Sequence, residues 1–210
     1  MAIGNFGELK AAILADMSGR SDITDALLEQ FVGSAEDVLY QDLRIRFMET
    51  DASVTVTEAT RTSALPSRWL EGRVVALVSA ISTIPEYVTP KVYWNLHADR
   101  PVATPDVYTI SRDNFIWGPI PIQTATATVT YYKRPASLSA NSDTNGLFSV
   151  APDLLKLGAL IQGYSYIGDS AKMAGVAVQY QALFERVMAA DRRDRYSGDT
   201  VVATTEAQRT

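Results

Sequence analysis

Residues 152–167 read PDLLKLGALIQGYSYI, a helical segment with apolar side chains on nearly every face. Pro152 suits the first position of a helix. Between Leu154 and Ile167 the only clearly polar side chains are Lys156, Gln162 and Ser165. A helix that is apolar almost all round must be covered on more than one side. The segment therefore predicts a helix buried within a bundle.

Three further segments supply partners for that helix. The sequence predicts helices over 6–17, from about 22 to 47, and over 170–196. Apolar side chains recur at three- and four-residue steps in each, which is the period of an amphipathic helix. In the second of these helices, Arg44 and Arg46 are expected in the last turn, where cations suit the helix dipole.

The middle of the chain changes from a helical period to a period of two. Residues 124–132 alternate threonine with alanine, valine and tyrosine, which predicts a half-buried strand. Residues 107–110 and 115–117 flank a polar four-residue segment and predict a hairpin. Thr89 before Pro90 predicts a short helix over 90–97. Residues 136–150 are rich in Ser, Asn and Asp and predict a loop.

These elements predict an α+β fold that is mainly helical. Both ends of the chain form an antiparallel helical bundle (residues 1–47 and 151–196), and a small antiparallel β subdomain (residues 48–150) is inserted between them. Gly158, Gly163, Gly168 and Gly175 lie in or near the last two helices. Glycine in a helix costs about 1 kcal/mol relative to alanine, which close approach of another helix would justify. Frayed helix ends are an equal alternative for Gly168 and Gly175.

Residues 197–210, SGDTVVATTEAQRT, contain only two sizeable apolar side chains, Val201 and Val202. So little buriable surface does not offset the entropy of ordering a segment. We therefore expect an extended tail that a partner protein holds. The preceding Arg192, Arg193, Arg195 and Tyr196 have two readings, namely complementing a helix dipole or anchoring the tail on an acidic partner. We favour the anchor, because the unsupported tail follows directly.

Composition limits the function more than any motif does. The formal charge of −5 and pI of about 4.9 argue against general nucleic-acid binding, while remaining compatible with a pore through which DNA slides. The absence of cysteine excludes disulfides and thiolate chemistry. We expect no signal peptide and no membrane-spanning helix.

No residue pattern indicates catalysis, a cofactor or a metal. His97 is the only histidine, and no phosphate-binding loop, dinucleotide fingerprint or nucleophile elbow is present. Acidic pairs such as Glu36 with Asp37 are expected to form ion-pair faces. The sequence predicts a protein that is not an enzyme.

Aromatic residues cluster between 87 and 132, where we expect core packing and protein interfaces. Tyr131 and Tyr132 are adjacent on a strand, so they face opposite sides. Of the two, we expect one in the core and one, Tyr132, at a subunit or tail interface. Trp117 and Tyr180 are assigned to the same kind of interface.

Several stretches, in this order and spacing, resemble podovirus-type phage head-to-tail adaptor proteins. They are NFGEL (5–9), DLRIRFME (42–49), ALPSRWLE (64–71), VYTI (107–110), FIWGPIP (115–121), VTYYKRP (129–135), PDLL (152–155) and ADRRDRYSG (190–198). The resemblance covers nearly the whole chain.

The resemblance implies a ring, usually of twelve copies, that binds beneath the portal protein of a filled capsid. The bundle would pack around the ring, the β subdomain would project from it, and the C-terminal extension would reach the portal. Nozzle and fibre proteins would attach below, and DNA would pass through the channel without specific binding. Such a protein is made in the bacterial cytoplasm and ends at the head–tail junction of the virion. No membrane is involved.

Two other functions remain open at this point. A cell-wall glycan hydrolase needs two carboxylates across a cleft, for which Glu71 and Glu86 are the residues to test. Some adaptors of this type carry a hydrolase activity, but no matching motif is present here. A single-stranded nucleic-acid binder would use the aromatic cluster as a stacking platform, which the acidic charge disfavours.

Overall fold

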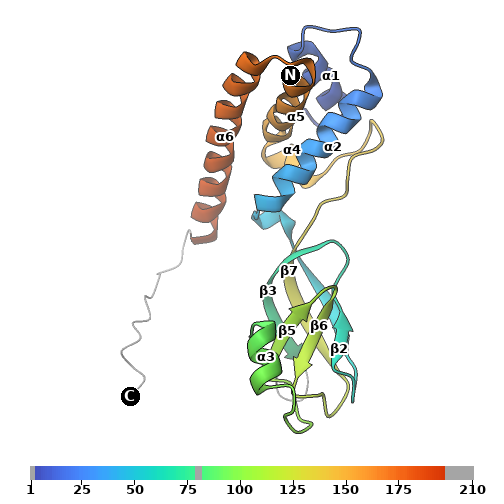
Figure 1. Cartoon of the computed structure of the whole chain (residues 1–210), viewed down its shortest axis with the longest axis vertical. Coiled ribbons are helices and arrows are strands. Elements are labelled where there is room, and N and C mark those ends of the chain that lie inside the picture. The colour runs from blue at the N-terminus through green and yellow to red at the C-terminus, as the bar shows by residue number, and fades with distance from the viewer. Residues whose placement is uncertain (1–2, 79–81, 197–210) are drawn as a thin grey trace. The chain divides into compact units, whose positions relative to one another are not determined.

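The computed structural model describes residues 3–78 and 82–196. The described residues of Met1–Phe47 and Ala136–Thr210 form a helical unit, and those of Met48–Pro135 form a β unit. Residues 136–150 thus group with the helices, whereas the sequence analysis placed them in the inserted subdomain. The two units are described in turn (Figure 1).

The helical unit consists of α1 (Phe6–Asp16), α2 (Asp25–Asp42), α4 (Gly146–Val150), α5 (Pro152–Ile167) and α6 (Ser170–Tyr196). Asparagine or threonine side chains cap the N-termini of α1, α2 and α4 by accepting backbone N–H groups. Helix α2 ends at Asp42, five residues before the expected end, because Leu43 adopts an extended backbone. Arg44 therefore lies beyond the helix, yet its guanidinium still donates to the carbonyl of Tyr40, 3.1 Å away.

Helix α5 contacts both α2 and α6, so it lies between them (Figure 1). It contributes Leu154, Leu155, Ala159 and Leu160 to the core of the helical unit. Gly158 allows this packing, because a Cβ there would lie 3.1 Å from Cβ of Ala35 on α2. Gly168 serves differently, since its φ of 75° ends α5 in a left-handed cap.

The β unit contains β1 (Glu49–Val56), β2 (Thr62–Ala64), β3 (Trp69–Val78), β4 (Glu86–Tyr87), α3 (Pro90–Leu96), β5 (Val107–Ser111), β6 (Asn114–Gly118) and β7 (Ala125–Lys133). A 3₁₀ turn, Arg46–Met48, precedes β1. One sheet has the order β1-β7-β3 and the other β2-β6-β5-β4. All pairings are antiparallel except that of β4 with β5.

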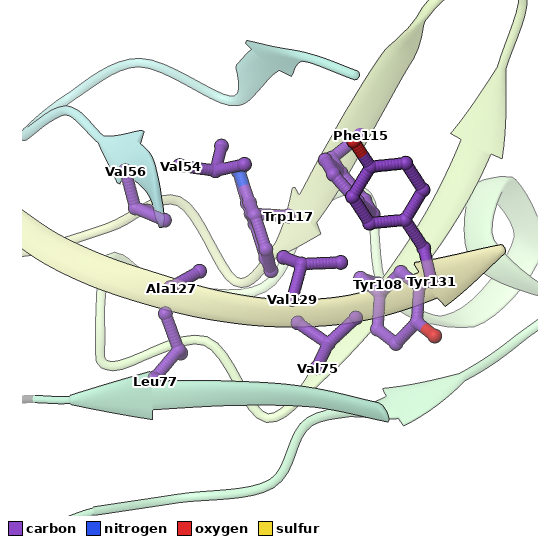
Figure 2. Packing of buried hydrophobic residues seen from close by; sticks show 10 residues of the cluster. All are labelled: Val54, Val56, Val75, Leu77, Tyr108, Phe115, Trp117, Ala127, Val129 and Tyr131. Atoms are coloured by element: carbon purple, nitrogen blue, oxygen red, sulfur yellow. The ribbon is translucent and has the colours of Figure 1, made fainter. Parts of the chain in front are cut away.

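The core of the β unit lies between strands of both sheets. Figure 2 shows its side chains, which are Val54, Val56, Val75, Leu77, Tyr108, Phe115, Trp117, Ala127, Val129 and Tyr131. Trp117 has no exposed surface, and its indole N–H donates to Oγ of Ser63 at 3.1 Å. Ser63 in turn donates to the carbonyl of Thr55 at 2.7 Å, so the indole N–H and the Ser63 hydroxyl both have partners.

The expectation of a mainly helical chain with a small inserted sheet is wrong. The described part of the chain is 45% helical and 24% strand, and its strands form two sheets of three and four. Strands such as β2 and β4 have three and two residues, too few to show a period in the sequence. They are strands because neighbouring strands pair with them, which is a tertiary effect.

Candidate functional site

Helix α6 is the longest element, with 27 residues, and it is covered on one side only. Between Ser170 and Arg195 no side chain is buried. Half-buried residues recur with a helical period and form the face toward α5, namely Met173, Val176, Ala177, Tyr180, Leu183, Phe184, Val187 and Met188. The opposite face is exposed, and 71% of Val178 is accessible to solvent. Monomer packing alone therefore uses less than half of this helix.

Tyr180 fixes the middle of α6 on α5. An added Cβ at Gly158 would lie 3.5 Å from its ring, an ordinary contact distance, so the ring packs beside this glycine. The ring also stacks on Phe184, with centroids 6.3 Å apart. Burial raises the pKa of the Tyr180 hydroxyl, and the nearby Asp42 carboxylate raises it further. Tyr180 is thus a packing residue within the subunit.

Asp191 fixes the end of α6. Its carboxylate accepts the backbone N–H of Arg46 at 2.6 Å and the Nε–H of Arg195 at 2.5 Å. The side chains of Arg195 and Asp191 are only 15% and 12% exposed. Arg46 follows α2 in the chain, so this contact joins the far end of α6 to the residues after α2.

An open groove of about 600 Å³ lies between the C-terminal half of α6 and other residues of the helical unit. We call it the α6 groove. Its wall on α6 is made of Leu183, Arg186, Val187, Ala190, Asp191 and Asp194, and the opposite wall of Ile45, Arg46, Phe47 and residues 150–153. Val150 at its edge is 53% exposed. The surface is mostly apolar, with a few charged side chains in its lining, which is typical of a protein-binding groove.

A helix with one free face and an apolar groove at its end indicate binding to other proteins. Comparison with known protein families agrees, since the family described as SU10 adaptor protein matches residues 4–204.

The chain belongs to the SU10 adaptor protein family.

This membership confirms the predicted relation to phage head-to-tail adaptors. The adaptor is accordingly a structural virion component of the head–tail junction. None of the curated proteins matches the chain. None of the helices in the described ranges is long and apolar enough to cross a membrane.

The structure separates the residues assigned to portal binding. Arg192 and Arg193 are exposed, and Nε of Arg193 donates to the carbonyl of Ala189, at 3.4 Å. Arg195 differs, because its guanidinium is engaged by Asp191. Tyr196 is the last residue of α6. Val201 and Val202 lie outside the described residues.

The other predicted interface residues also need revision. Trp117 is completely buried in the β unit, so no part of it is available to a neighbouring subunit and we withdraw it from the interface. Tyr132 is only 8% exposed, and the guanidinium of Arg73 lies 5.8 Å from its ring centre. Tyr131 is in the core, as expected for one member of the pair. The sequence could not distinguish buried from exposed aromatic residues at these positions.

The sequence analysis did not single out several exposed apolar side chains on the β unit of the adaptor. They lie within or next to α3, β4 and two loops, and they are Ile84, Tyr87, Trp94, Leu96, Val102 and Ile122. The adjacent residues Tyr93 and Trp94 of α3 differ in how far their side chains are exposed. Tyr93 points inward and its hydroxyl donates to the carbonyl of Trp117, whereas Trp94 is 55% exposed. A helical wheel for 90–96 was the available signal, because adjacent residues on a short helix face different directions.

The polar clusters of the adaptor have structural partners. His97 Nδ1 lies 3.2 Å from the guanidinium of Arg100, which holds both carboxylate oxygens of Asp106. The hydrogen bond from Arg100 lowers the pKa of Asp106. Glu71 lies on β3 and Glu86 on β4, in different sheets. Among residues 3–78 and 82–196, no group of three or more histidine and acidic residues is placed to hold a metal ion.

Proposed function

We propose that this adaptor forms a ring beneath the portal protein of a filled phage capsid and connects it to the tail. Nozzle and fibre proteins attach to the ring, and its channel continues the path of the DNA. The observation that carries this proposal is the one-sided packing of α6, which presents Val178 and four neighbouring alanines to solvent. The alanines are Ala171, Ala174, Ala182 and Ala189.

Two glycines support a contact between copies through helix faces. Gly33 in α2 and Gly175 in α6 lie inside helices, and a Cβ at either would meet no atom within 4 Å. Each costs about 1 kcal/mol relative to alanine. Packing within the subunit does not require them, whereas close approach of a neighbouring helix would. A head-to-tail contact of this kind closes into a ring when its rotation fits, and twelve copies is the number implied by the resemblance.

The two ends of the proposed connection use different surfaces. Arg192, Arg193 and the segment 197–210 face the portal, and many such weak contacts on one ring add up to a strong attachment. The exposed apolar side chains of the β unit, with Trp94 and Leu96 as anchors, bind the tail proteins. The acidic net charge of −5 suits a channel that does not retain DNA.

The test compares attachment to portal-containing capsids for matched variants. Val178→Asp on α6 is expected to abolish ring assembly and capsid attachment, because a charge would be placed in a helix contact. Val102→Asp in the β unit is the control, since Val102 is also about half exposed, at 52%. It should attach to capsids normally and lose only the tail proteins. Full capsid attachment by Val178→Asp would refute the ring contact.

The tail is tested separately. Deleting residues 197–210 is expected to abolish attachment to the portal while leaving the circular dichroism spectrum unchanged. If the truncated adaptor still decorates capsids fully, the portal is bound by another part of the chain.

A further inference from the structure

Helix α2 runs antiparallel to α5 along one of its sides. An added Cβ at Gly163 of α5 would lie 3.6 Å from the ring of Phe31 on α2. An added Cβ at Gly158, earlier in α5, would lie 3.1 Å from Cβ of Ala35, later in α2. Residues of α2 therefore meet α5 in the reverse order.

Helix α6 is antiparallel to α5 as well. Nζ of Lys172 lies 5.6 Å from the ring centre of Tyr164, near the end of α5. The ring of Tyr180, later in α6, would lie 3.5 Å from a Cβ at Gly158. Helices α2 and α6 thus run parallel to each other, with Ala35 and Tyr180 at about the same level. Because α5 lies between them, each has an outer face that points away from α5 (Figure 1).

The exposed sides of these two outer helices carry opposite net charge. Helix α2 has no lysine or arginine, and its exposed charged side chains are Asp25, Glu29, Asp37 and Asp42. Helix α6 exposes two acidic and four basic side chains, which are Glu185, Asp194, Lys172, Arg186, Arg192 and Arg193. Complementary charge favours contact of α2 with α6 over contact of either helix with its own counterpart. A second copy of this chain therefore offers a matching surface.

Individual positions on the two outer faces also match. Val178 and Gly33 lie two residues before Tyr180 and Ala35, so they are at about the same level. Val178 is 71% exposed, and a Cβ at Gly33 would meet no atom within 4 Å. Without a side chain at this position, the backbone of α2 can be approached closely. A valine of a neighbouring copy can pack there.

A pair of opposite charges lies farther along both outer faces. Asp37 is exposed one turn after Gly33, and Arg186 is exposed about two turns after Val178. By the same alignment, Arg186 is about four residues beyond the level of Asp37, a rise of about 6 Å. The long side chain of an arginine can span this offset.

We propose that α6 of one copy packs against α2 of the next copy in the ring, with Val178 on Gly33 and Arg186 paired with Asp37. The inference rests on the proposed function, in which copies join through α6, and it names the surface that α6 meets. Two different faces are used, so the contact is head-to-tail and can repeat from copy to copy.

Crosslinking tests the contact directly, because the chain has no cysteine of its own. The variant Gly33→Cys with Val178→Cys is made in the full-length chain. It is oxidised at high adaptor concentration without capsids, and separately on portal-containing capsids. We expect a ladder of covalently linked copies on a non-reducing gel. Each copy then forms one disulfide through α2 and another through α6.

The matched control is Val38→Cys with Val178→Cys. Val38 is also on α2 and is 52% exposed, but it lies five residues from Gly33, or about 140° around the helix. This pair should remain monomeric on the gel. Equal crosslinking of the two pairs would overturn the proposal. Dimers formed by Val178→Cys alone would mean that α6 meets α6 of another copy, which contradicts it as well.

Charge reversal gives a second test that does not depend on cysteine geometry. Arg186→Glu alone and Asp37→Lys alone should each reduce ring formation, measured by sedimentation of the adaptor at high concentration. The combined variant should recover ring formation, because the pair is restored with its charges exchanged. A purely structural role of either residue predicts no recovery. A combined variant that assembles no better than the single variants would overturn the pairing.

The outcome is separable from that of the proposed function. If the ring does not bind a portal, the crosslink between positions 33 and 178 still forms at high concentration without capsids. If copies join through α6 but α6 meets a surface other than α2, Val178→Asp still abolishes capsid attachment while this crosslink is absent under both conditions. The first result supports the α2–α6 contact, and the second overturns it.

Discussion

Helices α5 and α6 are neighbours in the chain and in space, yet they are built for different surroundings. Seven residues of α5, including two glycines, are buried between α2 and α6. Helix α6 is longer and has no buried side chain between Ser170 and Arg195. In a free subunit, a helix without buried side chains gains little stability from packing. The difference shows that α5 holds the subunit together, whereas the outer face of α6 is available for the assembly.

The largest expected effect comes from truncating the inner helix. Leu154→Ala removes a side chain with no exposed surface and should lower the free energy of unfolding of the helical unit by about 2–5 kcal/mol. The matched variant Leu183→Ala on α6 should cost about 1–2 kcal/mol, less than the inner variant, because that side chain is only partly buried. Urea unfolding measures both. Equal losses would contradict the distinction between the two helices.

The next effect concerns the attachment at the end of α6. Asp191→Asn keeps the shape of the side chain but removes the charge that holds the Arg46 N–H and Arg195. We expect a loss of about 1–2 kcal/mol in stability and faster hydrogen exchange at the Arg46 amide. Asp153→Asn is the control, since that carboxylate is 65% exposed and lies 4.0 Å from Lys156. Should both variants behave alike, Asp191 does not fix the helix end.

Acid should loosen the start of α6 before it affects α5. The backbone N–H of Lys172 donates to the Asp169 carboxylate at 3.1 Å and lowers its pKa. A lowered folded-state pKa means that the stabilisation is present above the unfolded value of about 3.9 and is lost as the pH falls through the folded value. No side chain caps the start of α5, which has Pro152 there. Hydrogen exchange of the first turn of α6 from pH 5 down to pH 2 checks this.

The variant Asp169→Asn provides the matching control for the acid experiment. Asparagine also caps helices but does not titrate, so the dependence of the first turn on pH should disappear. A dependence that persists in this variant would assign the effect to another group.

The smallest effect on stability is expected on the outer face of α6. Val178→Ala should change the free energy of unfolding by no more than about 0.5 kcal/mol, because 71% of the side chain is already exposed. Its effect should appear only in assembly, measured by analytical ultracentrifugation with portal present. A marked loss of subunit stability would mean that this face packs within the subunit.

Much of the helical unit follows from the sequence. The apolar pattern of 152–167 predicted the buried helix α5, and in the β unit Thr89-Pro90 correctly predicted α3. The boundary of α2 was misplaced because Ile45 and Phe47 continue an apolar pattern after the backbone has become extended at Leu43. Helix α4 was missed, since its five residues lie in a segment whose polar composition resembles a loop.

The β unit and the site were less predictable, for a physical reason. In β3, Val74, Val75, Leu77 and Val78 are all apolar, yet Val75 and Leu77 are buried while Val74 and Val78 are 47% and 52% exposed. Burial depends on which strands face each other, as with Trp117 and Trp94, and residue type alone does not determine it. The α6 groove combines residues from α6, the segment that follows α2, and the end of α4 with the start of α5, so no contiguous motif encodes it.

Hydrogen exchange of α6, measured in the isolated adaptor and again on portal-containing capsids, tests the central claim most directly. The isolated subunit should show α6 exchanging much faster than α5, and the assembled particle should protect α6 from Ser170 to Tyr196. If α6 is protected as well as α5 in the isolated subunit, or is no better protected after assembly, α6 is not the helix through which this adaptor joins its partners.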